Sequence, residues 1–193
     1  MASLSRYLAK LLRHDAPACG FDISEEGYVD VAEILEEKPQ YTEADVRKVV
    51  NNDRKGRFHL RTHHGRLEIK ATQGHSIQLE KPDLTPITHF TEARTVLHGT
   101  SSSRWNAIKN EGLSRMRRTH IHFTTSESGA RSGFPRGCDI AIEINMEKAL
   151  RAGIKFYTSE NEVILSPGNS DGLILPKYFK SAYNLRTRQQ LQI

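Results

Sequence analysis

The sequence has little of what several common kinds of active site require. It contains two cysteines, Cys19 and Cys138, too few and too far apart for a disulfide framework or a structural zinc site. No paired carboxylates, metal-ligand spacing or phosphate-cradling glycine loop accompanies its histidine motifs. A signal peptide and a run of about 18 apolar residues are both missing. These absences predict reduced thiols and an intracellular protein, cytoplasmic or nuclear, with no membrane segment.

Composition is that of a folded protein of one or two domains. Charged residues make up 26% and hydrophobic residues 37% of the 193 residues, which excludes a disordered chain. The net charge of +5 favours acidic partners, although a basic isoelectric point alone predicts binding poorly. Residues 1–83 hold 13 basic and 14 acidic residues, so the excess positive charge lies in residues 84–193, which hold 15 and 9.

Two clusters of basic residues stand out from this average. Residues 46–70 contain only Asp53 and Glu68 as acids, against eight basic residues: Arg47, Lys48, Arg54, Lys55, Arg57, Arg61, Arg66 and Lys70. The second cluster comprises Arg115, Arg117 and Arg118. Each cluster taken alone fits a solvated charged face as well as an anion-binding surface.

The first half is expected to fold as three helices followed by small strands. Apolar residues from 4 to 12 recur at helical spacing, with Ser3 or Ser5 as the cap and Arg13-His14 in the last turn. Further helices are predicted at 31–36 and after a Thr42–Asp45 capping box. Strands are predicted at 28–31, 57–61, 67–70 and 76–79, with a turn at His64-Gly65. This order describes a winged helix that carries the first basic cluster on its third helix and wing.

The second half is expected to be a compact α+β domain. Residues 81–86, with their two prolines, predict a linker between domains 1–83 and 84–193. Beyond the linker, alternation and apolar spacing predict strands at 95–97, 120–123, 140–144 and 163–165. Helices are predicted at 102–110 and 146–152.

Two histidine motifs lie in the second half. His98-Gly99-Thr100 is expected to follow a strand, where Gly99 lets the backbone approach a ligand and the flanking side chains offer hydrogen bonds. A structural histidine is the simpler alternative for this tripeptide. In His120-Ile121-His122, strand alternation places both histidines on one face. Two histidines could ligate a metal ion, but no third ligand stands at a supporting spacing, so no metal site is predicted.

Two polar motifs, Arg13-His14 and Gln73-Gly74-His75-Ser76, lie in the first half. On its own, each has a simple explanation, as cations at the end of a helix or as a polar turn before a strand. Together with the histidine motifs they supply donors and cations. Such a set predicts an anionic, phosphate-rich ligand.

Taken together, these motifs resemble the NAD-dependent RNA 2′-phosphotransferase family, the tRNA 2′-phosphotransferases. The resemblance spans Leu4 to about Leu185 and includes further short segments: Asn52 to Phe58 (NDRKGRF), Gly112-Leu113, Ser159 to Leu165 (SENEVIL), Pro167-Gly168 and Leu175 to Phe179 (LPKYF). It implies two lobes. The N-terminal lobe would be a winged helix that holds RNA, and the C-terminal lobe would resemble the ADP-ribosyltransferases and hold NAD.

The resemblance also implies a reaction in two steps. An internal RNA 2′-phosphate attacks the ribose carbon of NAD that bears nicotinamide, and nicotinamide leaves. The neighbouring 2″-hydroxyl then attacks the phosphorus of the 2′-phospho-ADP-ribosylated RNA. The products are RNA with a free 2′-hydroxyl and ADP-ribose 1″,2″-cyclic phosphate. A spliced tRNA is the implied substrate, and we expect a monomer.

The family's catalytic histidine and arginines match Arg13-His14 and Arg57. Guanidinium groups would grip the 2′-phosphate, and His14, with an unperturbed pKa of about 6.5, would transfer a proton in the second step. The remaining arginine falls before the strand expected at 140–144. Arg136 lies at nearly the right distance and is preferred. Arg131 has the more familiar neighbours but requires a larger insertion.

The family's NAD-binding motifs match His98, Gly99 and Thr100, His120 and His122, and Ser159 with Asn161. Gln73 and His75 are grouped with these cofactor-binding residues, because they are expected where the lobes meet. Arg54 and Lys55, beside Arg57, are the expected RNA-binding residues. Relatives usually carry glycine after the asparagine that matches Asn161, where this chain has Glu162. A side chain and a negative charge there would change what the loop contacts.

Three other functions would use some of these features. A winged-helix nucleic-acid-binding module with a non-enzymatic second domain explains the basic cluster but gives the later histidine motifs no role. An ADP-ribosyltransferase that stops after the first step and caps terminal phosphates fits the NAD motifs. The presence of Arg13, His14 and Arg57 favours both steps. A hydrolase of NAD that uses no RNA leaves both arginines unexplained.

Overall fold

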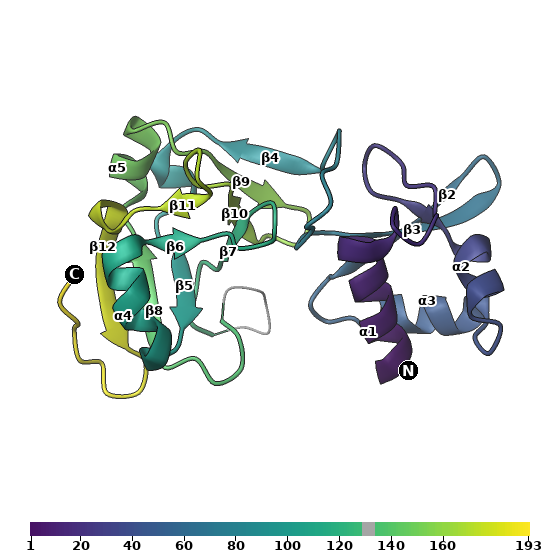
Figure 1. Cartoon of the computed structure of the whole chain (residues 1–193), viewed down its shortest axis with the longest axis horizontal. Coiled ribbons are helices and arrows are strands. Elements are labelled where there is room, and N and C mark those ends of the chain that lie inside the picture. The colour runs from purple at the N-terminus through teal and green to yellow at the C-terminus, as the bar shows by residue number, and fades with distance from the viewer. Residues whose placement is uncertain (129–133) are drawn as a thin grey trace. The chain divides into compact units, whose positions relative to one another are not determined.

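The computed structural model describes residues 1–128 and 134–193, which form two compact units (Figure 1). The first unit comprises Met1–Asp83 and the second Leu84–Ile193. The described residues form five α-helices and several small antiparallel sheets, so the chain is a mixed α/β protein. None of the described helices combines the length and apolar character that crossing a membrane requires.

The first unit packs helices against a three-stranded antiparallel sheet in which β3 lies between β1 and β2. Its elements in chain order are α1 (Ala2–Lys10), a π-helical turn (Leu11–Asp15), β1 (Val29–Asp30), α2 (Val31–Glu37), α3 (Glu43–Asn51), β2 (Phe58–His63) and β3 (Arg66–Ala71). Six branched apolar side chains with no exposed surface form the centre of its core: Leu4, Leu8, Leu12, Ile34, Val46 and Ile69. Each contributes about 1.5–3 kcal/mol through burial.

Two local signals in this unit confirm the sequence-based expectation. Asp45 N donates to Thr42 Oγ1 at 3.3 Å, and Thr42 N donates to Asp45 Oδ2 at 2.9 Å, which forms the capping box that starts α3. His64 and Gly65 connect β2 to β3 with φ values of 49° and 76°. Two successive residues with positive φ are what a tight hairpin turn requires.

The first helix starts earlier than expected. It begins at Ala2, with Met1 in the N-cap position and no side-chain cap, so Ser3 and Ser5 lie inside the helix. It then widens into the π-helical turn Leu11–Asp15. The apolar spacing located the helix, but the choice of a serine cap was wrong.

The third strand of the sheet is not the expected one. Residues 76–79 form no strand, because Ser76 N and Ile77 N donate to the carbonyl of Arg13, at 2.9 and 3.4 Å, and not to a neighbouring strand. The sheet is completed by β1, which pairs antiparallel with β3. The polar segment after β3 therefore belongs to the surroundings of Arg13.

The described residues of the second unit form three small sheets. The four-stranded sheet has the order β4 (Leu84–Ile87), β9 (Phe156–Ser159), β10 (Ile164–Ser166) and β7 (Ile121–Phe123). The three-stranded sheet has the order β12 (Phe179–Asn184), β8 (Ile140–Ile144) and β5 (Leu97–Thr100). The remaining elements are the pair β6 (Leu113–Ser114) and β11 (Leu173–Ile174), the helices α4 (Ser102–Glu111) and α5 (Met146–Arg151), and the 3₁₀ turns Phe90–Glu92 and Pro176–Tyr178.

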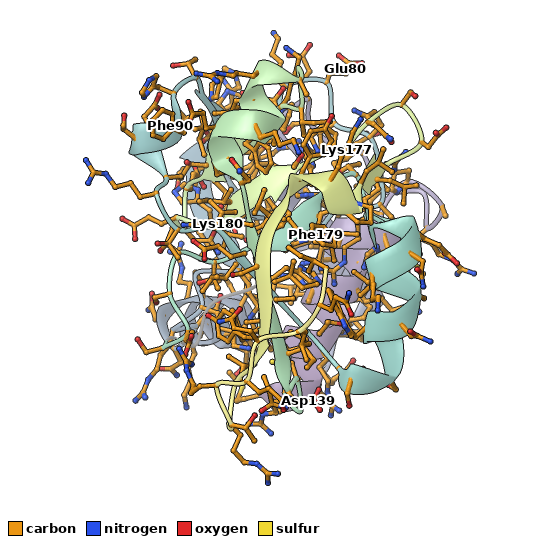
Figure 2. All side chains as sticks on the ribbon, turned by 90° about the vertical axis from the view of Figure 1, so that its left-hand side faces the viewer. Glu80, Phe90, Asp139, Lys177, Phe179 and Lys180 are labelled. Atoms are coloured by element: carbon orange, nitrogen blue, oxygen red, sulfur yellow. The ribbon has the colours of Figure 1, made fainter. Side chains whose placement is uncertain are left out.

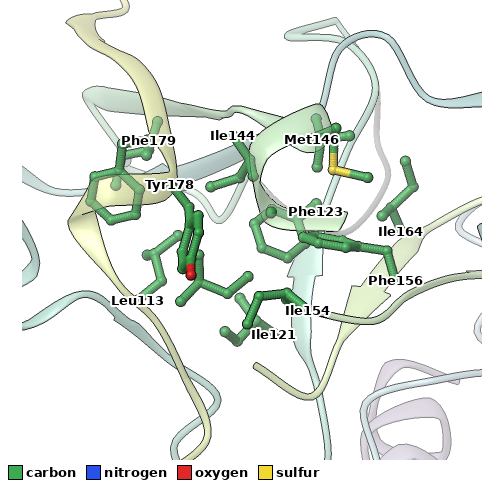
Figure 3. Close-up of a cluster of buried hydrophobic side chains, with 14 of the residues drawn as sticks. Leu113, Ile121, Phe123, Ile144, Met146, Ile154, Phe156, Ile164, Tyr178 and Phe179 are labelled. Atoms are coloured by element: carbon green, nitrogen blue, oxygen red, sulfur yellow. The ribbon is translucent and has the colours of Figure 1, made fainter. Parts of the chain in front are cut away.

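Apolar side chains from both larger sheets meet in the core of this unit (Figure 3). Phe123 of β7 and Phe156 of β9 pack with ring centroids 6.0 Å apart. Trp105 of α4 contacts Phe179 of β12 with centroids 6.4 Å apart. An isolated bridge between Leu97 and Thr124 also joins β5 to the end of β7, the two strands that carry the histidine motifs.

Several expectations for the second unit need correction. Residues 84–86, expected within the linker, belong to β4, which pairs with β9. β4 is an edge strand, where Pro86 is tolerated because its missing N–H can face away from the ladder. The strand expected at 95–97 lies at β5, so His98-Gly99-Thr100 is part of the strand and does not follow it. The range expected for β8 is confirmed, whereas β6, β9, β11 and β12 were not expected.

Candidate active site

Arg13 and His14 lie on the π-helical turn that continues α1. The wider turn is closed by Ala16 N, which donates to the carbonyl of Leu11 at 2.8 Å. Leu11 and Leu12 are buried in the core, whereas the two polar side chains are only partly buried. Such π-helical turns are rare and occur frequently at functional sites.

Residues 73–76 pack directly against this turn. Ser76 N donates to the carbonyl of Arg13 at 2.9 Å, and Ser76 Oγ lies 2.8 Å from His14 Nδ1. Gly74 has a φ of 87°, and a Cβ atom at this position would lie 3.2 Å from Arg13 Nε. Glycine therefore permits both the left-handed backbone and the close approach of the guanidinium group.

Arg57 is held by a buried carboxylate. Asp53 Oδ1 accepts from Arg57 Nε at 2.9 Å, and Asp53 Oδ2 accepts from the backbone N of Arg57. The Asp53 side chain is 2% exposed and that of Arg57 is 32% exposed. Arg57 also donates through Nη2 to Ser5 Oγ at 3.3 Å, and its guanidinium lies 5.6 Å from the centre of the Phe58 ring. In the described part of the chain, no hydrogen bond engages Nη1.

One segment connects Arg57 with the Arg13-His14 pair. Thr72 N donates to the carbonyl of Arg57 at 2.9 Å, and the Gln73 side chain lies 2.6 Å from Thr72 Oγ1. Gln73 and His75 are 5% and 7% exposed, respectively. Residues 72–76 thus contact both parts of the predicted catalytic set within the first unit. Gln73 and His75, which the sequence analysis grouped with the cofactor-binding residues, both belong to this segment, and their role stays a prediction.

Most basic side chains of residues 46–70 are paired with carboxylates. Arg61 donates to both Glu26 and Glu68 at 2.6 Å. Four other basic residues also form pairs: Arg47–Glu43, Arg57–Asp53, Arg66–Asp30 and Lys70–Asp83. Several of these acids come from outside the stretch, so the sequence overstated its excess of positive charge. Arg54 and Lys55, the expected RNA-binding residues, are exposed in the turn between α3 and β2.

His98 lies in β5, and its ring is fixed by a backbone carbonyl. Because a carbonyl only accepts, His98 Nδ1 donates to the His122 carbonyl at 2.8 Å, which leaves Nε2 as an acceptor in the neutral ring. The ring packs edge-on against Phe123 with centroids 5.8 Å apart. Burial lowers the pKa of His98 below its ordinary value of 6.5, and the carbonyl opposes this effect. The next two residues, Gly99 and Thr100, are buried.

His120 and His122 face the same side of the four-stranded sheet, as the alternation predicted. His122 pairs with Leu165, which also pairs with Tyr157, so these three side chains share one face. The His120 ring contacts the Tyr157 ring edge-on, with centroids 6.0 Å apart. His122 is 7% exposed, whereas His120 is partly buried just before β7 begins.

Arg115 and Arg118 place positive charge beside these two histidines. Arg115 Nη1 donates to the carbonyl of Arg118 at 2.8 Å. The Arg115 side chain crosses Gly172, where a Cβ atom would lie 2.5 Å from Arg115 Nε. Burial and then the charge of Arg115 lower the pKa of His120 below 6.5. Arg118 Nη1 lies 3.5 Å from His122 Nδ1, to which it can only donate.

Ser159 is the last residue of β9, and Asn161 lies in the turn that leads to β10. Ser159 Oγ donates to Asn161 Oδ1 at 2.5 Å and accepts from Val163 N at 3.3 Å. Glu162 has a φ of 61°, which is the left-handed region that favours glycine. The backbone here therefore keeps a glycine-like conformation although the residue is glutamate.

Arg136 is exposed in a turn that is closed by Cys138 N, which donates to the carbonyl of Pro135 at 3.2 Å. Asp139 anchors this turn, because its backbone N donates to the Thr100 carbonyl and its Oδ1 accepts from the α4 N-terminus at 2.7 Å. In Figure 2, Asp139 lies toward the opposite end of β12 from Phe179. Arg131 lies outside the described residues, so the preference for Arg136 stays a prediction.

The candidate site residues in the described part of the chain offer hydrogen-bonding groups and cations. No group of three or more His, Cys, Asp or Glu side chains is placed there to hold a metal ion. Instead, the histidines of residues 120–122 have arginines as neighbours. Cations and neutral hydrogen-bonding rings are therefore the chemical resources of these residues.

Comparison with known proteins is consistent with this chemistry. Residues 1–168 match the family described as RNA 2′-phosphotransferase, Tpt1/KptA. The chain belongs to this family. It is 38% identical over 192 residues to tRNA 2′-phosphotransferase 1 of Danio rerio, across 95% of the chain and 85% of that relative. It is 40% identical over 200 residues to the proteins of the same name from Mus musculus and Homo sapiens, across 98% of the chain and 80% and 79% of those relatives.

Four polar residues that contact the candidate site residues of this RNA 2′-phosphotransferase family member were not recognised from the sequence. Asp53 and Ser76 contact Arg57 and His14, whereas Arg115 and Arg118 lie beside His120 and His122. Asp53 and Ser76 belong to quoted motifs, which was the available signal. The two arginines were visible only as a basic cluster, because nothing in the sequence relates them to particular histidines.

Proposed function

We propose that this family member transfers an internal RNA 2′-phosphate, as left at a tRNA splice junction, to NAD. The expected products are RNA with a free 2′-hydroxyl, ADP-ribose 1″,2″-cyclic phosphate and nicotinamide. One observation carries the proposal: Arg57 and the Arg13-His14 pair are both held by residues 72–76 in a member of the RNA 2′-phosphotransferase family. The zebrafish, mouse and human relatives are named tRNA 2′-phosphotransferase 1, which supports tRNA as the substrate.

The two units are proposed to divide the substrates. The order of elements in residues 1–83, with three helices, a short strand and a closing hairpin, supports a winged helix that holds RNA. Residues 84–193 are proposed as the ADP-ribosyltransferase-like lobe that holds NAD. Support comes from the two histidine motifs at β5 and β7, which the Leu97–Thr124 bridge joins. All proposed site residues belong to one chain, so a monomer is sufficient.

The residues of the second unit fit NAD, which contains ribose hydroxyls and a diphosphate. Hydroxyls donate to a neutral histidine, and His98 offers such an acceptor at Nε2. A diphosphate needs cations, which Arg115 and Arg118 supply. The residues proposed to hold NAD are His98, Gly99, Thr100, His120, His122, Ser159 and Asn161, with Gln73 and His75 of the first unit. When bound, NAD supplies an electrophilic ribose carbon whose nicotinamide is already a cationic leaving group.

The first unit is proposed to act on the RNA 2′-phosphate. The planar guanidinium groups of Arg13 and Arg57 bind phosphate oxygens in two-pronged fashion, which lysine does not. Their charge stabilises the phosphoryl group as it is transferred. His14 moves a proton in the second step, where a hydroxyl attacks phosphorus and the RNA 2′-oxygen leaves. Arg54 and Lys55, exposed in the neighbouring turn, bind the RNA backbone.

The last catalytic arginine is proposed to be Arg136. Arg131 is the alternative from the sequence, and Arg118 joins them because it lies 3.5 Å from His122 Nδ1. Single alanine variants of the three separate these assignments. Arg136→Ala is expected to stall the reaction while the other two retain it. The reverse pattern would move the role to whichever variant stalls.

The deciding experiment uses a short RNA with one internal 2′-phosphate, incubated with the full chain in the presence and absence of NAD. We expect the phosphate to be lost only with NAD, together with release of ADP-ribose cyclic phosphate. RNA that gains ADP-ribose but never resolves would instead identify a capping ADP-ribosyltransferase. Bound RNA without any reaction would identify a binding module. Either of these results would overturn the proposal.

A further inference from the structure

His14 and Arg57 each have one side-chain nitrogen in contact with another side chain of the protein: Nδ1 of His14 and Nε of Arg57. A side chain that reacts with or grips a substrate needs a fixed orientation, because misplacement by about 1 Å can cost about a hundredfold in rate. In each case the contact comes from a polar residue that the proposed reaction does not use. These two residues are Ser76 and Asp53.

The backbone at Ser76, whose side chain contacts His14, is itself held by hydrogen bonds. Its backbone N donates to the carbonyl of Arg13 at 2.9 Å, and Ile77 N donates to the same carbonyl at 3.4 Å. The Ser76 hydroxyl then lies 2.8 Å from His14 Nδ1. With Nδ1 engaged in this way, proton transfer to or from a substrate runs through Nε2 of the ring.

Asp53 controls both the backbone and the side chain of Arg57. One carboxylate oxygen accepts from the Arg57 backbone N, and the other accepts from Nε at 2.9 Å. The Asp53 side chain is 2% exposed, so substrate or solvent hardly reaches it. The contact occupies the Nε edge of the guanidinium and directs the Nη groups away from Asp53. Ser5 Oγ, 3.3 Å from Nη2, limits rotation further.

We propose that Ser76 and Asp53 are positioning residues, which orient His14 for proton transfer through Nε2 and aim the Arg57 guanidinium at the RNA 2′-phosphate. The inference rests on the proposed function. It adds that neither residue touches the substrate, and that each acts only through its partner. The expected signature is therefore a loss that disappears once the partner is removed.

The Ser76 arm compares Ser76→Ala with Ser76→Thr, which keeps a hydroxyl. Ser76→Ala is expected to lower kcat of the second step about tenfold and to displace its pH profile, with the KM for RNA unchanged. Ser76→Thr restores both. In a His14→Ala background, Ser76→Ala should have no further effect on the residual rate. An equal tenfold loss in that background would show a general structural role and overturn the proposal.

The Asp53 arm uses Asp53→Asn, which keeps the shape of the side chain. Its carbonyl oxygen can accept from only one of the two Arg57 groups, while its amide N–H groups face the other donor. We expect a loss of about tenfold to a hundredfold in kcat of the second step, which vanishes in an Arg57→Ala background. A loss of the same size with alanine at position 57 would contradict the proposal.

Matched controls come from the same unit. Ser24 Oγ accepts from Tyr28 N at 2.9 Å, and Asp30 Oδ1 accepts from Ala32 N at 2.8 Å, so each stabilises its local backbone. Ser24→Ala and Asp30→Asn are expected to have the same effect whether or not the catalytic partner is present. The wild-type reaction separates the two claims. A wild type that fails to remove the 2′-phosphate with NAD refutes the proposed function, whereas an active wild type with additive variants refutes only the positioning inference.

Discussion

Arg57 in the first unit and His98 in the second are both partly buried. They differ in charge: Arg57 is a cation, whereas His98 is a neutral ring. The charge of Arg57 is paired with that of Asp53, which is 2% exposed and accepts from the Arg57 side chain and backbone. His98 stays neutral because burial lowers its pKa. A buried charge is costly unless it is paired. A permanent cation therefore needs a carboxylate, whereas a histidine can give up its proton.

This difference indicates what each unit can bind. Fixed cations in the first unit suit a phosphate at any pH near neutrality. Neutral rings in the second unit suit hydroxyl groups, with Arg115 and Arg118 adding local charge for a diphosphate. Under the proposed function, changes in the first unit should affect phosphate transfer, and changes in the second should affect the use of NAD.

The largest effect is expected from Arg57→Ala. Loss of its hydrogen bonds to the transferring phosphate should slow the second step by about 10²–10³-fold, and should slow the first step less. ADP-ribosylated RNA should therefore accumulate, which gel electrophoresis detects. Arg57→Lys keeps the charge without the planar fork and should recover only part of the rate. Equal loss of both steps, with no trapped RNA, would break the division between the units.

The complementary change in the second unit is His98→Ala. Removal of one hydrogen-bond acceptor should raise the KM for NAD about tenfold. The affinity for 2′-phosphorylated RNA should stay at the wild-type value, because His98 belongs to the other unit. Steady-state kinetics with varied NAD and a separate RNA-binding titration test this. A larger change in RNA affinity than in KM for NAD would reverse the assignment.

Protonation offers a further way to compare the units. Above pH 6.5, the ordinary pKa of His98, the ring is neutral in both folded and unfolded chains. As the pH falls, the unfolded chain takes up the proton first, since the folded pKa is lowered. Stability is therefore lost with falling pH, by at most about 1.4 kcal/mol per pH unit from this residue. Urea unfolding at several pH values should show a weaker dependence in His98→Gln. An unchanged dependence would mean that His98 titrates normally.

Charge pairing in the first unit predicts a smaller difference in RNA binding. Arg66 Nη1 lies 3.3 Å from Asp30 Oδ2, whereas Arg54 is exposed in the turn between α3 and β2. Arg54→Ala is expected to make the negative slope of log K against log salt less steep by about 0.7–0.9, the range for one phosphate contact. Arg66→Ala should leave that slope unchanged. If both variants gave the same slope, pairing with carboxylates would not decide which cations meet RNA.

The sequence predicted those elements whose signals are local. The capping box at Thr42 and the turn at His64-Gly65 depend on residues within three positions of each other. β12 was not predicted from the sequence, because its pairing with β8 shifts register between Phe179 and Ser181. The buried residues Phe179 and Ala182 are therefore three positions apart. A strand with such a bulge lacks the period of two that reveals it.

The same limit applies to the site. Contiguous motifs identified Arg13-His14 and Arg57, but their environment comes from distant positions. Ser76 lies 62 residues from His14, and Glu26 lies 35 residues from Arg61. A side-chain contact between such positions leaves no periodic trace, so the sequence predicted the charges without their partners.

The smallest effect is expected in the second unit, from Glu162→Gly. Glu162 has a φ of 61°, at a position where the family resemblance predicts glycine. A side chain in the left-handed region costs about 1–2 kcal/mol, and the extra freedom of unfolded glycine takes back about 0.5–1 kcal/mol. The variant should therefore be more stable by up to about 1 kcal/mol in chemical unfolding. Glu160→Gly is the matched control, because Glu160 lacks a positive φ and should lose stability. If Glu162→Gly were destabilised like this control, contacts of the glutamate side chain would outweigh the strain.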